Sequence, residues 1–311
     1  MKNSNFRKSC REYFILKNKK NKILFFFILF LLFEIEIIGH NTNVKICLCT
    51  IGKEENRYIK EYIEHYRKYG VDKIFLYDNN NVDGEKFEEI IPEFIKKKYV
   101  EIINIRGKKA VQLKSFNHCY QKHLTKYNWF IFYDIDEFIF LRGIENLKYY
   151  LSQSKFNKCQ VIQLNWVMHG DNNLLHYSNK SLKERFPEKS KSLNGTIDIK
   201  SIIRGNIKTN ISSVHYLNPK LISCDGFGKI KKGHFINRKR DTQFYYIDHY
   251  YTKSTEEFIA KMMKGDVAWK KERRFEILPA YFDLNKITLE KIQYIENKTL
   301  IKLNKFKEKI E

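Results

Sequence analysis

Apolar residues recur with two different periods along residues 44–77, and together these periods predict strands separated by a helix. Val44 to Thr50 is an apolar run of strand length. After a polar turn, the apolar residues follow the spacing of one helix face, and the pattern stops at Gly70: Ile59, Tyr62, Ile63 and Tyr66. Val71 to Tyr77 is apolar apart from Asp72 and Lys73 and predicts a second strand.

The same order of elements continues to residue 133. A turn-rich segment from Asp78 to Gly84 precedes a predicted helix over 85–97, which Pro92 is expected to bend. Further predicted elements are a strand over 100–105, a helix over 112–124 and a strand over 129–133. The second half is less regular, with predicted strands at 161–167, 197–204 and 244–249, a polar insertion at 172–194, and helices at the end.

This order of elements predicts an α/β fold with a mostly parallel sheet flanked by helices, because strands joined through helices form right-handed parallel units. Such sheets bind ligands at the carboxyl ends of their strands. The sequence has neither a Gly-x-Gly-x-x-Gly after the first strand nor a P-loop motif, which disfavours dinucleotide-binding and P-loop proteins. A chain of 311 residues fits one large domain. We place that domain at 44–285 and a helical tail at 286–311.

The first forty residues predict a membrane anchor. Residues 1–22 carry eight basic side chains and one acidic one, and residues 23–38 are apolar except for Glu34 and Glu36. No small-residue cleavage site follows, which favours an uncleaved signal anchor in a single-pass type II arrangement with a cytoplasmic basic tail. In a eukaryote the rest of the chain would lie in the Golgi or secretory lumen. The alternative is an ordinary hydrophobic helix, because a spanning helix needs about 20 residues.

The formal net charge of +22 favours an anionic partner, such as nucleic acid, a lipid surface or a phosphorylated substrate. Beyond residue 22 the basic residues are spread along the chain, and no DNA-reading module is recognisable, so no nucleic acid partner is expected. Four Asn-x-Ser/Thr sequons would permit a secretory location: Asn179, Asn194, Asn210 and Asn297.

The six cysteines have neither the paired spacing of a zinc site nor the density of a disulfide scaffold. Cys47 and Cys49 alternate with apolar residues in the first predicted strand. We therefore expect these two as small core residues.

Asp134 and Asp136 form the first candidate site. They follow the apolar run over 129–133, and Asp is disfavoured in strands and costly to bury unless it is paired or binds a cation. Strand alternation would place both carboxylates on one side, where they could hold one divalent ion through oxygen ligands. Mg²⁺ or Mn²⁺ would then neutralise a diphosphate, which fits sugar transfer because negative charge builds on the departing phosphate.

His249 is the candidate third metal ligand. It ends an aromatic strand and is followed by a helix whose Ser254 and Glu257 match a capping box. Lys253 then lies near a helix amino terminus, where anions are stabilised. The alternative for His249 is a core histidine packed between tyrosines.

The order of these motifs resembles the family 92 glycosyltransferases and the related family 2-like transferases. The resemblance spans residues 44–269 and rests on several segments: Lys53-Glu54-Glu55, Tyr62 to Tyr66, Gly70-Val71, Phe75 to Asn79, Trp129 with Tyr133 to Phe138, His249 to Ser254, and Glu256-Glu257-Phe258. It implies a GT-A fold, related to the Rossmann fold, and inverting, metal-dependent transfer from a UDP-sugar, often UDP-galactose, to a glycan acceptor.

The resemblance also implies roles for individual residues. It places the nucleoside among Thr50, Lys53, Glu55 and Asp78, and places the ribose and the metal near Asp134. Asp136 and His249 would hold the metal. The chain departs from related sequences over Trp166 to Asn172, which leaves the acceptor side open.

An inverting reaction needs a general base for the acceptor hydroxyl. Asp171 is the candidate, with His169 and Glu256 as alternatives, although Gly170-Asp171-Asn172 also matches a simple turn. Two other functions stay open at this point. One is a basic membrane-bound adaptor without catalysis, and the other is a nucleotidyltransferase on a similar sheet.

Overall fold

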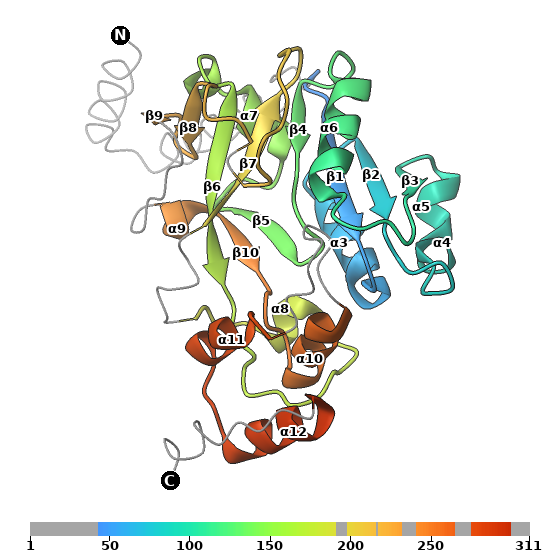
Figure 1. Ribbon diagram of the computed structural model, residues 1–311. Helices are drawn as coiled ribbons and strands as arrows, with labels where there is room; N and C mark the ends of the chain where they lie inside the picture. The colour runs from blue at the N-terminus through green and yellow to red at the C-terminus, as the bar shows by residue number, and fades with distance from the viewer. Residues whose placement is uncertain (1–42, 191–197, 216, 232–240, 265–274, 300–311) are drawn as a thin grey trace, which may run out of the picture. The chain divides into compact units, whose positions relative to one another are not determined.

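A computed structural model describes residues 43–190, 198–215, 217–231, 241–264 and 275–299. The chain divides into two units, 1–43 and 44–311, and the second is an α/β domain (Figure 1). Its strands form one sheet: β1 (Ile46–Gly52), β2 (Lys73–Asp78), β3 (Val100–Asn104), β4 (Trp129–Ile131), β5 (Glu137–Leu141), β6 (Val161–Met168), β7 (Ile199–Arg204), β8 (Ser223–Asp225), β9 (Ile230–Lys231) and β10 (Tyr245–His249).

The helices follow the expected order in the first half of the domain. They are α3 (Asn56–Lys68), α4 (Phe87–Ile90), α5 (Pro92–Lys96), α6 (Gln112–His123), α7 (Leu147–Ser152), α8 (Leu182–Arg185), α9 (Asp241–Phe244), α10 (Thr255–Lys264), α11 (Leu278–Leu284) and α12 (Leu289–Thr299), with a 3₁₀ turn at Ser154–Phe156. The predicted helix over 85–97 is divided at Ile91, because Pro92 cannot continue a helix and instead begins α5.

The sheet is mixed, which corrects the expectation of a mostly parallel one. The strand order is β3-β2-β1-β4-β7-β6-β10-β5. Pairs among β1 to β4 are parallel, whereas β7 is antiparallel to both β4 and β6, and β5 is antiparallel to β10. Two strands that follow each other in sequence can be parallel only if a long connection, usually a helix, joins them. No helix directly precedes β5, because it follows β4 through a short turn.

Six of the eight strands in this order nevertheless run in one direction. Because β6 is antiparallel to β7 and β10 is parallel to β6, both run with β1 to β4. Their carboxyl ends therefore meet at one edge of the sheet, and α8, α10, α11 and α12 lie beyond that edge (Figure 1).

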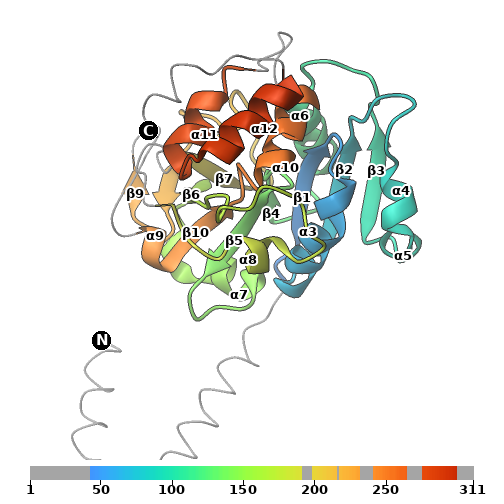
Figure 2. The ribbon, with the colours of Figure 1, turned by 90° about the horizontal axis from the view of Figure 1, so that it is seen from below.

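The two faces of the sheet carry separate cores. Alternate residues of β1 send Ile46 and Leu48 to one face, where α3, α5 and α7 pack, and Cys47 and Cys49 to the other, where α6 packs. Figure 2 shows α3 and α7 on one side of the sheet and α6 on the other. A third cluster joins α10, α11 and α12 through Phe258, Met262, Tyr281, Ile292 and Ile295. The predicted helical tail at 286–311 is thus packed against the domain over α12.

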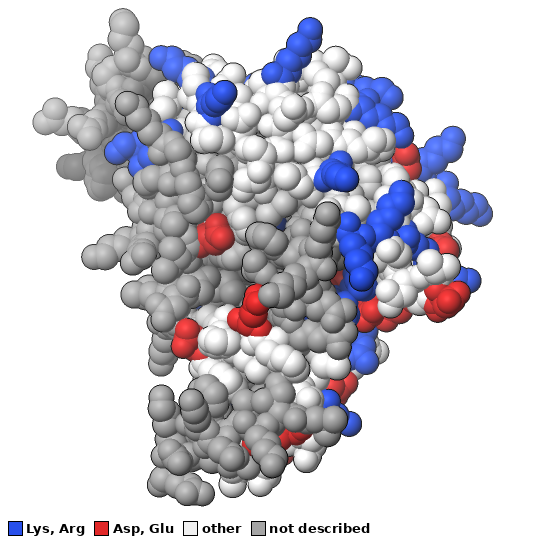
Figure 3. All heavy atoms as spheres, viewed as in Figure 1, with Lys and Arg blue, Asp and Glu red and all other residues white. Residues whose placement is uncertain are grey.

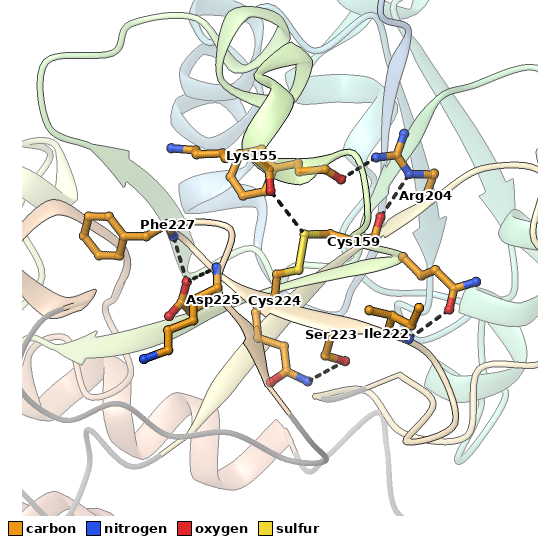
Figure 4. The surroundings of a disulfide bond; sticks show 12 residues. Lys155, Cys159, Arg204, Ile222, Ser223, Cys224, Asp225 and Phe227 are labelled. Atoms are coloured by element: carbon orange, nitrogen blue, oxygen red, sulfur yellow. Dashed lines mark hydrogen bonds between the residues drawn. A yellow bond between two sulfur atoms is a disulfide. The ribbon is translucent and has the colours of Figure 1, made fainter. Parts of the chain in front are cut away.

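Four of the cysteines form two disulfides, which the sequence did not predict. Cys49 of β1 is buried, as expected, but it is bonded to Cys119 of α6, and Cys159 is bonded to Cys224 of β8. Pairs 70 and 65 residues apart in sequence give no local spacing signal. Figure 4 shows how the second bond fixes β8 beside β6, where Arg204 donates to the carbonyl of Cys159.

The proposed anchor at 23–38 lies outside the described residues, as does the sequon at Asn194. Within the described parts of the chain, no helix is long and apolar enough to cross a membrane. Asn179, Asn210 and Asn297 are exposed.

We predict that the Cys159–Cys224 bond contributes strongly to stability. In the chain-entropy treatment, a cross-link that closes a loop of 65 residues stabilises by about 4 kcal/mol. A double Cys159→Ser, Cys224→Ser variant should therefore show a lower urea midpoint than the oxidised protein. Cys47→Ser is the matched control, because Cys47 is buried and forms no disulfide within the described residues. Equal midpoints for the double variant and the oxidised protein would contradict the bond.

Candidate active site

The acidic pair lies in a turn rather than in a strand. β4 ends at Ile131 and β5 begins at Glu137, so Asp134 and Asp136 belong to the connection between them. Alternation along a strand therefore does not govern where the two side chains point, and they take different partners.

Two tyrosines of α3 hold this turn by its backbone. The hydroxyl of Tyr62 donates to the carbonyl of Tyr133 at 2.9 Å, and the hydroxyl of Tyr66 donates to the carbonyl of Glu137 at 2.8 Å. Gly52, at the end of β1, leaves room for Ile135, because a Cβ there would lie 2.6 Å from the Ile135 side chain. The helix and β1 thus fix the turn on both sides.

Asp134 faces Lys200 and Gln112. The Lys200 ammonium lies 2.6 Å from Asp134 Oδ2, and the Gln112 amide donates to Oδ1 at 2.7 Å. Lys200 also lies 3.4 Å from the Glu137 carboxylate, and neither of these two side chains is exposed. Burial alone would lower the pKa of Lys200, but the Asp134 and Glu137 carboxylates raise it above its usual value. Lys200 is therefore a fixed positive charge beneath the turn.

Asp136 faces a different set of cations. Its Oδ2 accepts from Lys261 at 2.8 Å and from Lys253 at 3.4 Å, and its Oδ1 lies 3.5 Å from His249 Nε2. Burial would raise the pKa of this carboxyl, but Lys261, Lys253 and His249 hold it well below the usual range. Asp136 thus stays ionised in a buried position that collects positive charge.

His249 lies between Asp136 and Trp166. The two ring centroids of His249 and Trp166 are 4.3 Å apart, and burial lowers the pKa of the imidazole, although Asp136 opposes that shift. The neutral imidazole is the form that binds metals. Its Nδ1 is buried and has no hydrogen-bond partner among the residues that the structure describes.

The predicted capping box after His249 is present. The Ser254 hydroxyl accepts from the Glu257 backbone N–H, and the Glu257 carboxylate accepts from the Ser254 N–H. Glu257 also pairs with Arg185 at 2.6 Å and accepts from Tyr58 at 2.7 Å. This buried network fixes the start of α10 and, with it, Lys253, whose backbone is left-handed with φ of 54°.

The loop after β1 is joined to the other end of α10. Lys53 donates to the carbonyl of Lys264 at 2.9 Å, and Lys264 donates back to the Lys53 carbonyl and pairs with Glu55. Thr50 is fully buried on β1. The predicted nucleotide-binding residues of this loop therefore lie beside α10, which also carries the cation nearest to Asp136.

Asp78 ends β2 and is paired with Arg106. The guanidinium Nε lies 2.7 Å from Asp78 Oδ2, while Oδ1 accepts from the Asn80 backbone N–H at 3.0 Å. Both groups lie at the carboxyl edge of the sheet, on the side of β1 away from the acidic turn.

Asp171 lies beyond β6 among the C-terminal helices. Its Oδ2 pairs with Lys291 at 2.6 Å and accepts from the Tyr281 hydroxyl at 2.8 Å, and its Oδ1 accepts from the Asn173 N–H. None of these described partners contacts Asp134 or Asp136. Nearby His169 pairs with Asp248 at 2.6 Å. The structure thus joins Asp136, His249 and Lys253 but gives Asp134 and Asp171 separate surroundings.

A divalent ion fits this site through a small set of protein ligands. Over the described ranges, no group of three or more His, Cys, Asp or Glu side chains is placed to hold a metal. Mg²⁺, however, is commonly bound by one or two carboxylates together with substrate phosphates and water, rather than by a complete protein cage. Asp136 already attracts two ammonium groups and faces an imidazole nitrogen, so the oxygen and nitrogen donors suit such an ion.

Several residues of the site carried no sequence signal. Lys200 comes from β7 and Lys261 from the middle of α10, and each is one lysine among many in a lysine-rich chain. Gln112 and Glu137 are equally inconspicuous. One signal in the sequence indicates that Lys200 is buried. This lysine occurs among the apolar residues of the strand Ile199–Arg204, where a charged side chain needs a partner.

Charged side chains of both signs lie on the surface of the domain. On the coloured part of the face in Figure 3, Lys and Arg side chains are scattered and mixed with Asp and Glu, with no continuous basic stripe.

The fold and the site together define an α/β ligand-binding domain with charged groups gathered at the carboxyl edge of its sheet. The family model of glycosyltransferase family 92 matches residues 42–293. The chain belongs to glycosyltransferase family 92.

Family 92 proteins of plants are similar to part of the chain. A rice protein (Oryza sativa subsp. japonica) is 30% identical over 103 residues, which is 33% of this chain and 17% of the rice protein. A Ricinus communis protein is 29% identical over 104 residues, covering 33% of this chain and 18% of that protein. The matched segment thus spans less than a fifth of either relative.

Solved glycosyltransferase structures overlap only loosely with the chain. S. aureus TarS (residues 1–349) in complex with UDP-GlcNAc has 14% identity and a TM-score of 0.40, and covers 82% of this chain and 79% of TarS. A Pyrobaculum calidifontis mannosyltransferase in complex with GDP-Man and Mn²⁺ has 9% identity and a TM-score of 0.28, and covers 40% of this chain and 36% of that protein.

We predict that Lys200→Met destabilises the domain, because it leaves the buried Glu137 and the half-buried Asp134 without their cation. Breaking a buried pair costs about 3–5 kcal/mol, and we expect a loss near the lower end because Asp134 is partly exposed. Lys60→Met is the matched control, since Lys60 forms an exposed pair with Glu93 that contributes at most about 1 kcal/mol. Urea unfolding of both variants measures the difference, and equal midpoints would show that Lys200 is dispensable for the turn.

Proposed function

We propose that this chain is a glycosyltransferase that moves a sugar from a nucleotide-sugar donor to a glycan acceptor. The observation that carries the proposal is the position of Asp136, which lies with His249, Lys253 and Lys261 at the carboxyl edge of the sheet in a family 92 chain. A UDP-sugar is the proposed donor, with UDP-galactose as the first candidate, as the family resemblance implies.

The charged residues suit the main demand of this reaction. Negative charge builds on the diphosphate as the sugar bond breaks, and preorganised cations lower the energy of that state. Lys253 and Lys261 supply two ammonium groups in a largely buried setting, where their interaction with a diphosphate is stronger than in water. Lys53 and Glu55 lie at the other end of α10, within the part of the site proposed for the nucleoside.

We propose Mn²⁺ or Mg²⁺ as the cofactor, held by Asp136 and His249. When bound, such an ion acts as a Lewis acid that neutralises charge on the leaving diphosphate. Asp134 contributes to this role through its position in the same turn, while Lys200 and Gln112 orient its carboxylate.

The inverting course, with Asp171 as the general base, stays a prediction. Asp171 is paired with Lys291, and both of its carboxylate oxygens already accept hydrogen bonds. His169 and Glu256 are the alternatives. The configuration of the product at the anomeric carbon, read by NMR, tests the inverting course directly.

We predict that Asp136→Asn lowers turnover by a hundredfold or more, on the order of the loss caused by removing one charge-stabilising group, and leaves the fold intact. The assay is donor hydrolysis and transfer over a panel of nucleotide sugars with Mn²⁺. Asp83→Asn is the matched control, because Asp83 is exposed in the turn after β2.

Three outcomes of this screen separate the possible functions. Unchanged turnover in Asp136→Asn would remove the assigned role of this carboxylate. Release of a sugar 1-phosphate, with transfer of the nucleoside monophosphate, instead of release of a nucleoside diphosphate would indicate a nucleotidyltransferase. No turnover of any donor by the wild-type protein would favour a binding protein without catalysis.

We also propose that residues 23–38 anchor the chain as a single-pass type II membrane protein, with the domain in a secretory lumen. The two disulfides support an oxidising compartment, where such bonds persist. Deletion of residues 1–40 should turn a membrane-bound protein into a soluble one with its nucleotide-sugar chemistry retained. Membrane fractionation of the full-length protein and of the variant without residues 1–40 tests this prediction. Equal partition of the two into the soluble phase would refute the anchor.

A further inference from the structure

Three lysines from three separate elements neutralise the acidic turn, and they differ in their freedom to move. Lys200 of β7 is fully buried between Asp134 and Glu137. The Lys253 side chain is 4% exposed and lies over the Tyr58 ring at 4.5 Å. The Lys261 side chain is 24% exposed. Of these three lysine side chains, that of Lys261 is the most exposed to solvent.

The contacts of Lys261 are well suited to exchange. Its ammonium donates to Asp136 at 2.8 Å and to the Tyr251 carbonyl at 3.2 Å, and it lies 4.0 Å from the centroid of the Tyr251 ring. A lysine carries three donors on a flexible stem and can reorient without any movement of its helix. The helix itself is held at its end, where Lys264 is bonded to Glu55 and to the Lys53 carbonyl. Lys261 can therefore change partners by moving its side chain while α10 stays in place.

We propose that Lys261 is an exchangeable counter-ion: it neutralises Asp136 while no donor is bound, and it turns to the donor's diphosphate when Asp136 takes up a divalent ion. This inference rests on the proposed function. It explains why the shortest cation contact of Asp136 comes from its most accessible lysine.

The physical reason lies in the burial of Asp136, which is 6% exposed. A buried carboxylate without a cation is costly, so the donor-free protein needs a positive charge at that position. A divalent ion on Asp136 would repel the Lys261 ammonium, while the two negative charges of a diphosphate would attract it. The site would thus keep its charge balanced in both states, and Lys261 would compete with the ion for Asp136.

The competition gives a binding test that is independent of turnover. Mn²⁺ is titrated into the full-length protein in detergent micelles without donor, and free Mn²⁺ is followed by electron paramagnetic resonance. Lys261→Met should bind Mn²⁺ about tenfold more tightly than the wild-type protein, the effect of removing one competing charge-assisted hydrogen bond. Lys60→Met, an exposed lysine of α3, is the matched control and should bind as the wild type does.

A second titration measures the other partner of Lys261. With saturating Mn²⁺, Lys261→Met should bind UDP about tenfold more weakly than wild type, because it lacks the ammonium that faces the diphosphate. Lys261→Gln, which keeps a polar side chain of similar length, serves as a second variant with the same expected directions if the Met variant fails to fold.

The outcomes separate this inference from the proposed function. Equal or weaker Mn²⁺ binding by the Lys261 variants overturns the exchange, and so does equal UDP binding. Tighter Mn²⁺ binding with weaker UDP binding supports the exchange even if no nucleotide sugar in the panel is turned over, a result that would count against the glycosyltransferase proposal alone.

Discussion

The burial of carboxylates at the carboxyl edge of the sheet is the constraint on which the rest of the site depends. Asp136 and Glu137 are almost inaccessible to water, and an isolated buried charge is costly. Asp136 needs cations from another element, and Lys261 and Lys253 meet that need by holding its pKa well below the usual range. Glu137 lies beside Lys200, but burial raises the pKa of this carboxyl well above its usual value. The positions of β7 and α10 relative to the turn are tied to this charge balance.

This balance also joins the two halves of the chain. The first half supplies β1 to β4 and the acidic turn, and the second half supplies the lysines of β7 and α10 together with His249 of β10. The Glu257 network with Tyr58 and Arg185 fixes one end of α10, and the Lys264 pair with Glu55 fixes the other. A helix held at both ends can present charges to the site with little loss of order when a ligand binds.

Family membership and geometry contribute different parts of the functional argument. The family model covers most of the chain and shows its relationship, while the plant relatives match only over about a third of it. The roles proposed for single residues therefore depend on the contacts within this domain. The contrast between Asp136, which collects cations, and Asp171, which is bonded into the C-terminal helices, is of this kind.

The sequence by itself determined the α/β elements, the capping box at Ser254 and the placement of His249 at the end of a strand, because periodicity and caps are local signals. Only the tertiary structure decided the antiparallel position of β7, the Cys159–Cys224 bond and the separate partners of Asp134 and Asp136. The physical reason is that pairings between residues 60 or more positions apart depend on chain topology, and in a lysine-rich sequence no local pattern marks which lysine is buried against a carboxylate.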